Sequence, residues 1–147
     1  VIARWVEGSI ACRNFRPEYA FYAKREGATA TGPVDTKRVF ATVCTIGGED
    51  GWFYANLLWW IRGACDWVIG GPLEPGRRLT LLMEMKAPGA GVLEFVVQPQ
   101  GTGASVSATA YWHPAGVWGL VYWYALVPAH AFIFRGLTRA IIRRASR

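Results

Sequence analysis

The clearest pattern along the chain is an alternation of apolar and polar residues between positions 78 and 112. In residues 78–86, Leu79, Leu81 and Met83 alternate with polar positions such as Thr80 and Glu84. Residues 92–98 and 104–112 alternate in the same way. A period of two puts successive side chains on opposite faces of a strand. The pattern therefore predicts three consecutive antiparallel strands, a meander in which each strand has one buried face.

One strand and two helices are predicted before the meander. Residues 27–34 alternate threonines and end near a proline, which is typical of an edge strand. Asp35 stands at an N-cap position, and apolar residues at helical spacing follow it as far as two glycines at 47 and 48. Residues 51–69 are apolar nearly all round and run into Gly-Gly-Pro, which predicts a second, largely covered helix.

A long helix is predicted from Val117 to near the end of the chain, bent or interrupted at Pro128. The order is strand, two helices, antiparallel strands and a long apolar helix. A curved sheet folded around that helix buries both, so the fold class is α+β. This is the element order of the helix-grip fold, the START/Bet v 1-like architecture, although four strands are readable and that fold normally has about three more.

Length and composition limit the number of domains and the class of protein. The chain has 147 residues, 52% of them hydrophobic, which suits one folded domain. We assign residues 1–26 to an N-terminal arm or the end of a preceding segment, and residues 27–147 to the helix-grip domain. The three cysteines have no close pair, which argues against a disulfide framework or a CxxC site and favours a reducing, cytoplasmic compartment.

The net charge of +6 is unevenly distributed. No acidic residue follows Glu94, and the last thirteen positions hold five arginines: Arg135, Arg139, Arg143, Arg144 and Arg147. Spacing by four puts most of them on one helix face, which either meets water or binds phosphates, anionic lipid or an acidic partner. Nothing resembles a nucleic-acid-binding motif, so nucleic acid is not an expected partner.

Residues 114–134 lack formal charge and are long enough to span a membrane, but Pro128 and His130 inside them argue against a span.

Short sequence matches, spread from about residue 28 to the end, carry a family resemblance. They include Ile46-Gly-Gly48, Gly70-Gly-Pro72, Glu84-Met-Lys86, Leu93-Glu-Phe95 and Tyr122-Trp-Tyr124. The chain resembles an uncharacterised bacterial domain family, domain of unknown function 2867, of the START/Bet v 1-like (SRPBCC, polyketide cyclase-like) superfamily. The resemblance implies a possible NAD(P)-binding, short-chain-dehydrogenase-like domain in the same chain or a partner chain.

The chain departs from this family at one point. Family members look to have a polar stretch and a further strand or hairpin, on the order of 25 residues, where Pro72 here runs directly into Leu73. Either strands have been lost, or a loop between residues 72 and 73 is absent from this sequence. We favour the missing loop, because losing strands would expose the apolar face of residues 51–69.

No nucleotide, metal or nucleophile signature is present, so no cofactor is predicted. The candidate ligand-binding residues are polar or aromatic groups on apolar elements that should converge between sheet and long helix. The tryptophans, Trp118 included, either line a pocket there or fill a core. The candidates are Trp59, Arg62, Asp66, Met83, Met85, Phe95, Trp112, Tyr122, Trp123 and His130.

Several candidates have a structural alternative. Arg62 and Asp66, four apart on the predicted helix, form either a cavity-wall pair or an ordinary salt bridge. His130 is either a buried histidine bonding a carbonyl freed by Pro128, or an acid/base or ligand contact. Glu84 is expected to face water rather than act as a base, and His113 to lie in a loop.

These observations predict a domain that binds a small hydrophobic molecule in a pocket between the sheet and the C-terminal helix. The rival reading is a cyclase- or aromatase-like enzyme, in which Arg62, Asp66, Tyr122 and His130 act on a bound chain. In a third reading, the aromatic and arginine-rich surface of the long helix docks on a membrane or a second subunit.

Overall fold

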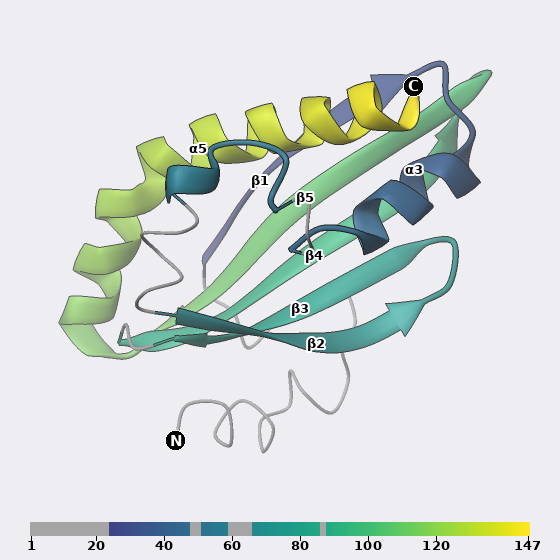
Figure 1. Cartoon of the computed structure of the whole chain (residues 1–147). Helices are drawn as coiled ribbons and strands as arrows, with labels where there is room; N and C mark the ends of the chain where they lie inside the picture. Colours follow the sequence, from purple (N-terminus) through teal and green to yellow (C-terminus); the bar gives the residue numbers. More distant parts are fainter. Residues whose placement is uncertain (1–23, 48–50, 59–65, 86–87) are drawn as a thin grey trace.

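A computed structural model describes residues 24–47, 51–58, 66–85 and 88–147. Within them, one antiparallel sheet has the strand order β1-β5-β4-β3-β2 (Figure 1). The strands are β1 (Lys24–Gly32), β2 (Asp66–Glu74), β3 (Arg78–Met85), β4 (Gly89–Gln100) and β5 (Gly103–Pro114). The helices are α3 (Thr36–Cys44) and α5 (Gly116–Ala145), and residues 56–58 are also helical.

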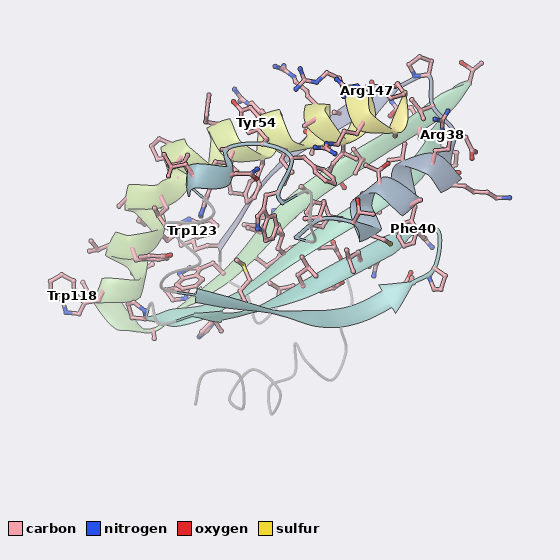
Figure 2. All side chains as sticks on the ribbon, viewed as in Figure 1. Arg38, Phe40, Tyr54, Trp118, Trp123 and Arg147 are labelled. Atoms are coloured by element: carbon pink, nitrogen blue, oxygen red, sulfur yellow. The ribbon has the colours of Figure 1, made fainter. Side chains whose placement is uncertain are left out.

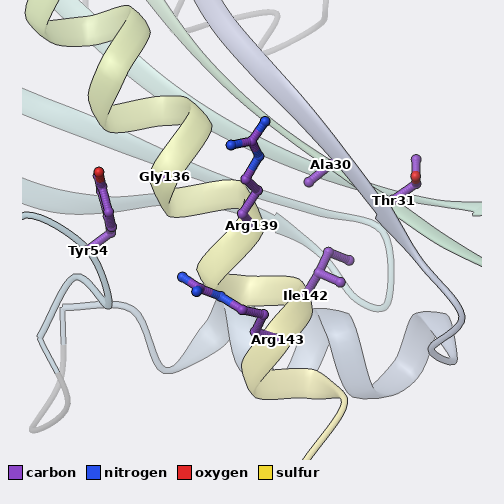
Figure 3. Close-up of a pocket in the computed structure, with 7 residues that line it drawn as sticks. All are labelled: Ala30, Thr31, Tyr54, Gly136, Arg139, Ile142 and Arg143. Carbon is purple, nitrogen blue, oxygen red and sulfur yellow. The ribbon is translucent and has the colours of Figure 1, made fainter.

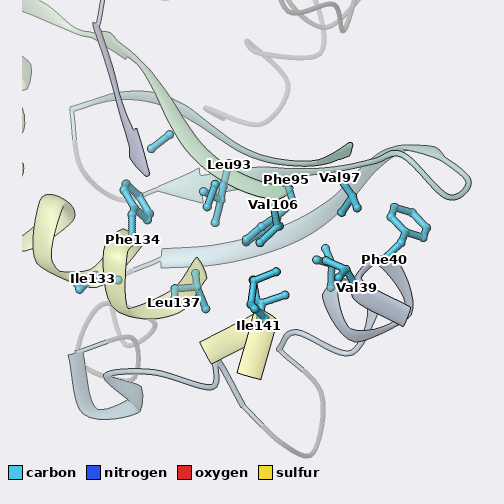
Figure 4. Packing of buried hydrophobic residues seen from close by; sticks show 14 of the residues in the cluster. Val39, Phe40, Leu93, Phe95, Val97, Val106, Ile133, Phe134, Leu137 and Ile141 are labelled. Atoms are coloured by element: carbon cyan, nitrogen blue, oxygen red, sulfur yellow. The ribbon is translucent and has the colours of Figure 1, made fainter. Parts of the chain in front are cut away.

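Both helices lie on the same face of the sheet. α5 packs over β1 and β5, while α3 packs over β3, β4 and β5 and touches α5 (Figure 1). Alternate residues of β5 are buried, as the alternating sequence predicts. Val39, Phe95, Leu137 and Ile141 meet in the core between the helices and the sheet (Figure 4). The predicted α+β helix-grip fold, a curved antiparallel sheet with a long C-terminal helix, is confirmed.

α5 is continuous through Pro128, which therefore does not end the helix. Within the described residues, α5 is the one helix long and apolar enough to cross a membrane by length and composition. One face of α5 packs in the core, where Trp123, Phe134 and Ile141 are buried against other elements.

The predicted helix over residues 51–69 is wrong at both ends. Residues 51–54 form turns and bends, and Phe53 and Ala55 have positive φ angles of 63° and 54°. Residues 66–69 belong to β2, whose first residue pairs with Met85 of β3. A short run that is apolar on all sides fits a buried strand as well as a buried helix. The β-branched Val68 and Ile69 suit the strand, and pairing with β3 decides it.

β2 runs through Pro72 and Leu73, with a register shift against β3 between Gly70 and Leu73. The described sheet therefore has one strand more than the sequence predicted. The shift lies where the family comparison places extra residues, and a missing loop there stays a prediction.

Candidate functional site

An aromatic cluster lies between the sheet and the first part of α5, residues 116–134. Trp112, at the end of β5, has its ring centroid 5.4 Å from that of Tyr122 and 6.5 Å from that of Trp123. The Trp112 and Trp123 rings are nearly parallel, at 11°. His130 and Phe134 continue the series along α5. These five residues, Trp112, Tyr122, Trp123, His130 and Phe134, are called the aromatic cluster below.

Trp112 ties the cluster to the start of α5. Its buried indole Nε1–H donates a hydrogen bond of 3.2 Å to the carbonyl oxygen of Gly119. Gly119 lies so close to the turn before β4 that a Cβ there would come 2.4 Å from the carbonyl oxygen of Pro88. A larger residue at 119 would push α5 away from Trp112. The cluster geometry thus depends on this close approach.

His130 is the titratable group inside the cluster. Its side chain is 5% exposed, and its ring centroid lies 5.5 Å from those of both Trp123 and Phe134. An imidazole can donate and accept hydrogen bonds at its two nitrogens. His130 therefore places one proton-transferring group among aromatic rings, with the half-buried phenol of Tyr122 at the margin of the same cluster.

The structure brings together six of the ten candidate residues. Met83 and Phe95 come from the sheet and, with Trp112, Trp123 and His130, are at least 95% buried. Tyr122 packs against this core. Figure 2 shows Trp123 on the inner side of α5, whereas Trp118 points away from the body of the protein. Trp118 is 75% exposed, so its predicted convergence on the core is wrong.

The other four candidate residues are Trp59, Arg62, Asp66 and Met85. Trp59 and Arg62 lie outside the described residues. Asp66 is the first residue of β2, so its predicted helical spacing from Arg62 is wrong. Asp66 and Met85 are register partners on β2 and β3, which places both on one end of the sheet. Glu84 lies on β3, and its predicted exposure stays a prediction. His113 belongs to β5, paired with Ala90, rather than to a loop as predicted.

Sequence reasoning missed a pocket of about 380 Å³ on the outer side of α5. Figure 3 shows Arg139 and Arg143 on successive turns of α5, with Tyr54 on one side of the helix and Ala30 and Thr31 on the other. The Tyr54 ring lies over Gly136, where a Cβ would come 2.0 Å from a ring carbon. The arginine spacing was a signal for this surface. Tyr54 comes from a distant segment, so no local pattern could have placed it there.

A second missed feature lies on the face of the sheet opposite the helices. Nε of Arg78 is 3.4 Å from a carboxylate oxygen of Glu94, and these residues are 8% and 4% exposed. The Tyr111 hydroxyl donates a 3.4 Å hydrogen bond to the same carboxylate. Burial, followed by the charge of Glu94, raises the pKa of Tyr111. The alternation assigned Glu94 correctly to the face opposite Phe95, but a period of two cannot show that this face is also covered.

Among the described residues, no group of three or more His, Cys, Asp and Glu side chains is placed to hold a metal ion. The aromatic cluster offers aromatic contact area, one buried imidazole and the phenol of Tyr122. The outer side of α5 offers a row of guanidinium groups.

Solved structures share this architecture. The aromatase/cyclase di-domain protein StfQ of the steffimycin biosynthetic pathway is 10% identical, with a TM-score of 0.56 over 88% of this chain and 52% of StfQ. DynU16, from the dynemicin biosynthetic locus, is 11% identical, with a TM-score of 0.55 over 83% of this chain and 47% of DynU16. The chain thus spans about half the length of each.

Norcoclaurine synthase from Thalictrum flavum is 11% identical, with a TM-score of 0.53 over 84% of this chain and 87% of that protein. These matches define the chain as a helix-grip protein, and at such identities they show the fold alone. Residues 73–137 match the sequence profile of the family described as protein of unknown function (DUF2867), which confirms the family resemblance. Comparison with curated proteins gave no match.

Proposed function

We propose that this domain binds a small hydrophobic molecule against the aromatic cluster, between the sheet and the first part of α5. The observation that carries the proposal is the cluster itself: four aromatic rings and one imidazole gathered at the junction of β5 and α5. Binding sites for small molecules are mostly apolar and aromatic, with a few polar groups that set orientation. His130 and Tyr122 are the polar groups in this arrangement.

The fold supports this proposal. StfQ is named as an aromatase/cyclase and the Thalictrum protein as norcoclaurine synthase, so both similar structures are named for reactions of small organic molecules. The first part of α5 also differs from the last part of the same helix, because its inner face carries large planar rings while the last part packs mainly with aliphatic side chains such as Leu137 and Ile141. We expect the bound molecule to be planar or largely apolar, since such a surface stacks on aromatic rings.

An enzyme of the cyclase or aromatase type is the second candidate. The observation in its favour is that His130 and Tyr122, two groups able to exchange protons, contact the same tryptophan pair. Arg62 and Asp66 would have to join them at the bound molecule. Binding is the more economical proposal, because it requires only the residues whose positions are described.

The test compares Tyr122→Ala with Tyr124→Ala. Tyr122 packs against the core, whereas Tyr124, two residues along the same helix, is 59% exposed. Binding of a hydrophobic fluorescent dye, followed by its emission, is expected to weaken severalfold in the Tyr122 variant and to stay unchanged in the Tyr124 variant. Native mass spectrometry of the purified chain is expected to show an adduct of a few hundred daltons that denaturation removes. Equal dye binding by both variants, together with an adduct-free spectrum, would contradict the proposal.

A further inference from the structure

The outer face of α5 carries two kinds of side chain in succession. In residues 116–134 the large exposed side chains are apolar or aromatic: Val117, Trp118, Val121, Tyr124 and Phe132 are 72%, 75%, 52%, 59% and 59% exposed. From position 135 the exposed positions of α5 are arginines, Arg135, Arg139, Arg143 and Arg144, and Arg147 follows the end of the helix. We call these two groups the apolar patch and the arginine stripe.

The two groups lie along one side of the helix. Val117, Val121, Tyr124, Pro128 and Phe132 follow each other by three or four residues, and the series continues through Arg135, Arg139 and Arg143. Residues at these spacings share a helix face. The apolar patch and the arginine stripe therefore lie along one side of α5, with Tyr54 packed beside Phe132 and Gly136 where the two groups meet.

Such a patch needs an explanation. Single exposed apolar residues are ordinary on protein surfaces, but contiguous groups with large aromatic side chains mark interaction sites. Figure 2 shows Trp118 extending from the first turn of α5, away from the rest of the protein. Its indole makes no contribution to the core described above.

The charge of the stripe decides what kind of partner fits. No acidic residue follows Glu94, so α5 itself carries no carboxylate beside its arginines. A second copy of α5 is a poor partner. When the whole face is covered, an antiparallel pair sets the apolar patch against the other copy's arginines, and a parallel pair sets arginines against arginines. The partner must instead be apolar at one end and anionic at the other.

We propose that the outer face of α5 docks on an anionic phospholipid bilayer. Trp118 and its apolar neighbours enter the boundary between headgroups and acyl chains, and the arginine stripe lies against lipid phosphates. Interfacial helices with tryptophan or phenylalanine on one side and arginines at headgroup level bind membranes in this way.

The pocket on the arginine stripe is the proposed binding site for a lipid phosphate. Arg139 and Arg143 line it from α5, Thr31 from β1, and Tyr54 from the segment before residues 56–58. Guanidinium groups bind phosphate oxygens with two parallel hydrogen bonds, and a hydroxyl group can add a third. The inner face of α5 stays in the core throughout, so docking needs no change of fold.

The test is sedimentation of the full 147-residue chain with phospholipid vesicles. Vesicles of mixed phosphatidylcholine and phosphatidylglycerol are expected to bind the chain, whereas vesicles of phosphatidylcholine alone bind it weakly. Since each arginine near an anionic membrane contributes roughly fivefold in affinity, Arg139→Gln/Arg143→Gln is expected to weaken binding by on the order of tenfold or more. The matched control is Lys37→Gln/Arg38→Gln, which removes the same charge from two exposed positions on α3 and should leave binding nearly unchanged.

Trp118 provides a second, independent test. Trp118→Ser is expected to weaken vesicle binding severalfold, and Trp118→Phe to retain most of it. Circular dichroism should show both variants folded, because the residue is exposed. Equal binding to neutral and anionic vesicles, or no binding at all, would overturn the proposal. So would a dimer in sedimentation velocity that Trp118→Ser disrupts in the absence of vesicle binding, because the surface would then be a protein interface.

Discussion

The inner face of α5 packs in two different ways along its length. In residues 116–134 it carries the rings of the aromatic cluster, held by one indole hydrogen bond and by ring contacts 5.4–6.5 Å between centroids. In residues 135–145 it carries Leu137 and Ile141, both 0% exposed, packed with the core valines of α3 (Figure 4). The first part offers groups that recognise or react with a molecule. The last part contributes close packing of buried side chains to the core.

This difference separates the part of the helix that holds the fold together from the part that can carry function. Aliphatic side chains locked between two helices and a sheet are difficult to rearrange. Planar rings with a half-buried tyrosine at their margin can admit another planar group at lower cost. We therefore expect mutations in the last part to act on stability, and mutations in the first part to act also on binding.

The largest expected effect is that of Leu137→Ala in the last part of α5. Removing three side-chain carbons from a fully buried leucine leaves a cavity, so the free energy of unfolding should fall by about 2–5 kcal/mol. Urea denaturation measures it. Val121→Ala, an exposed position on the same helix, is the control and should change stability by less than about 0.5 kcal/mol. A loss under about 1 kcal/mol for Leu137→Ala would mean that this part of α5 is not the rigid one.

A smaller effect is expected for Trp112→Phe in the aromatic cluster. The change removes the donor to the Gly119 carbonyl in a buried position, which should cost about 1–3 kcal/mol of unfolding free energy. Trp118→Phe is the same chemical change at a position that is 75% exposed, and we expect almost no effect on stability there. Equal losses in the two variants, measured by urea denaturation, would contradict the assignment of Trp112 as the anchor of α5.

The contact between Gly136 and Tyr54 gives a third, smaller effect. Alanine stabilises an exposed helix interior by about 1 kcal/mol relative to glycine, but here its Cβ would displace the Tyr54 ring. Gly136→Ala should therefore stabilise the Tyr54→Ala variant and give less stabilisation, or a loss, in the parent chain. A double-mutant cycle of unfolding free energies measures the coupling. Additive effects would show that the ring does not rest on the helix.

The smallest effect concerns Tyr111, on the sheet face that α5 does not touch. Its pKa is raised from the ordinary value near 10, because burial and Glu94 favour the neutral phenol in the folded state. The folded protein thus holds this proton more tightly than the unfolded chain. The resulting stability is fully present below about pH 10 and is lost as the pH rises through the folded pKa. Tyr111→Phe should flatten the alkaline fall of stability, and unchanged alkaline profiles would contradict this assignment.

The sequence predicted some elements of the fold better than others. The alternation in 92–98 and 104–112 predicted β4 and β5 and their buried faces, because a period of two is a local property of a strand. The same reading failed in residues 66–69, which join β2 through pairing with a strand that lies later in the chain. For the site, the inward positions of Phe95 and Trp112 followed from the alternation in their strands. The helical partnership of Arg62 and Asp66 did not, since it assumed an element that the sheet replaced.

By itself, the sequence determined the α+β class, the meander, the long terminal helix and the arginine row on it. These depend on side-chain periods and charges that a segment carries wherever it lies. Only the tertiary structure decided which tryptophans meet: Trp112 and Trp123 stack in the core, while Trp118 on the same helix as Trp123 points to solvent. It also brought Tyr54 onto Gly136 and paired Arg78 with Glu94. The physical reason is that contacts between distant segments depend on how the helices and strands pack, and no local pattern of residues encodes that packing.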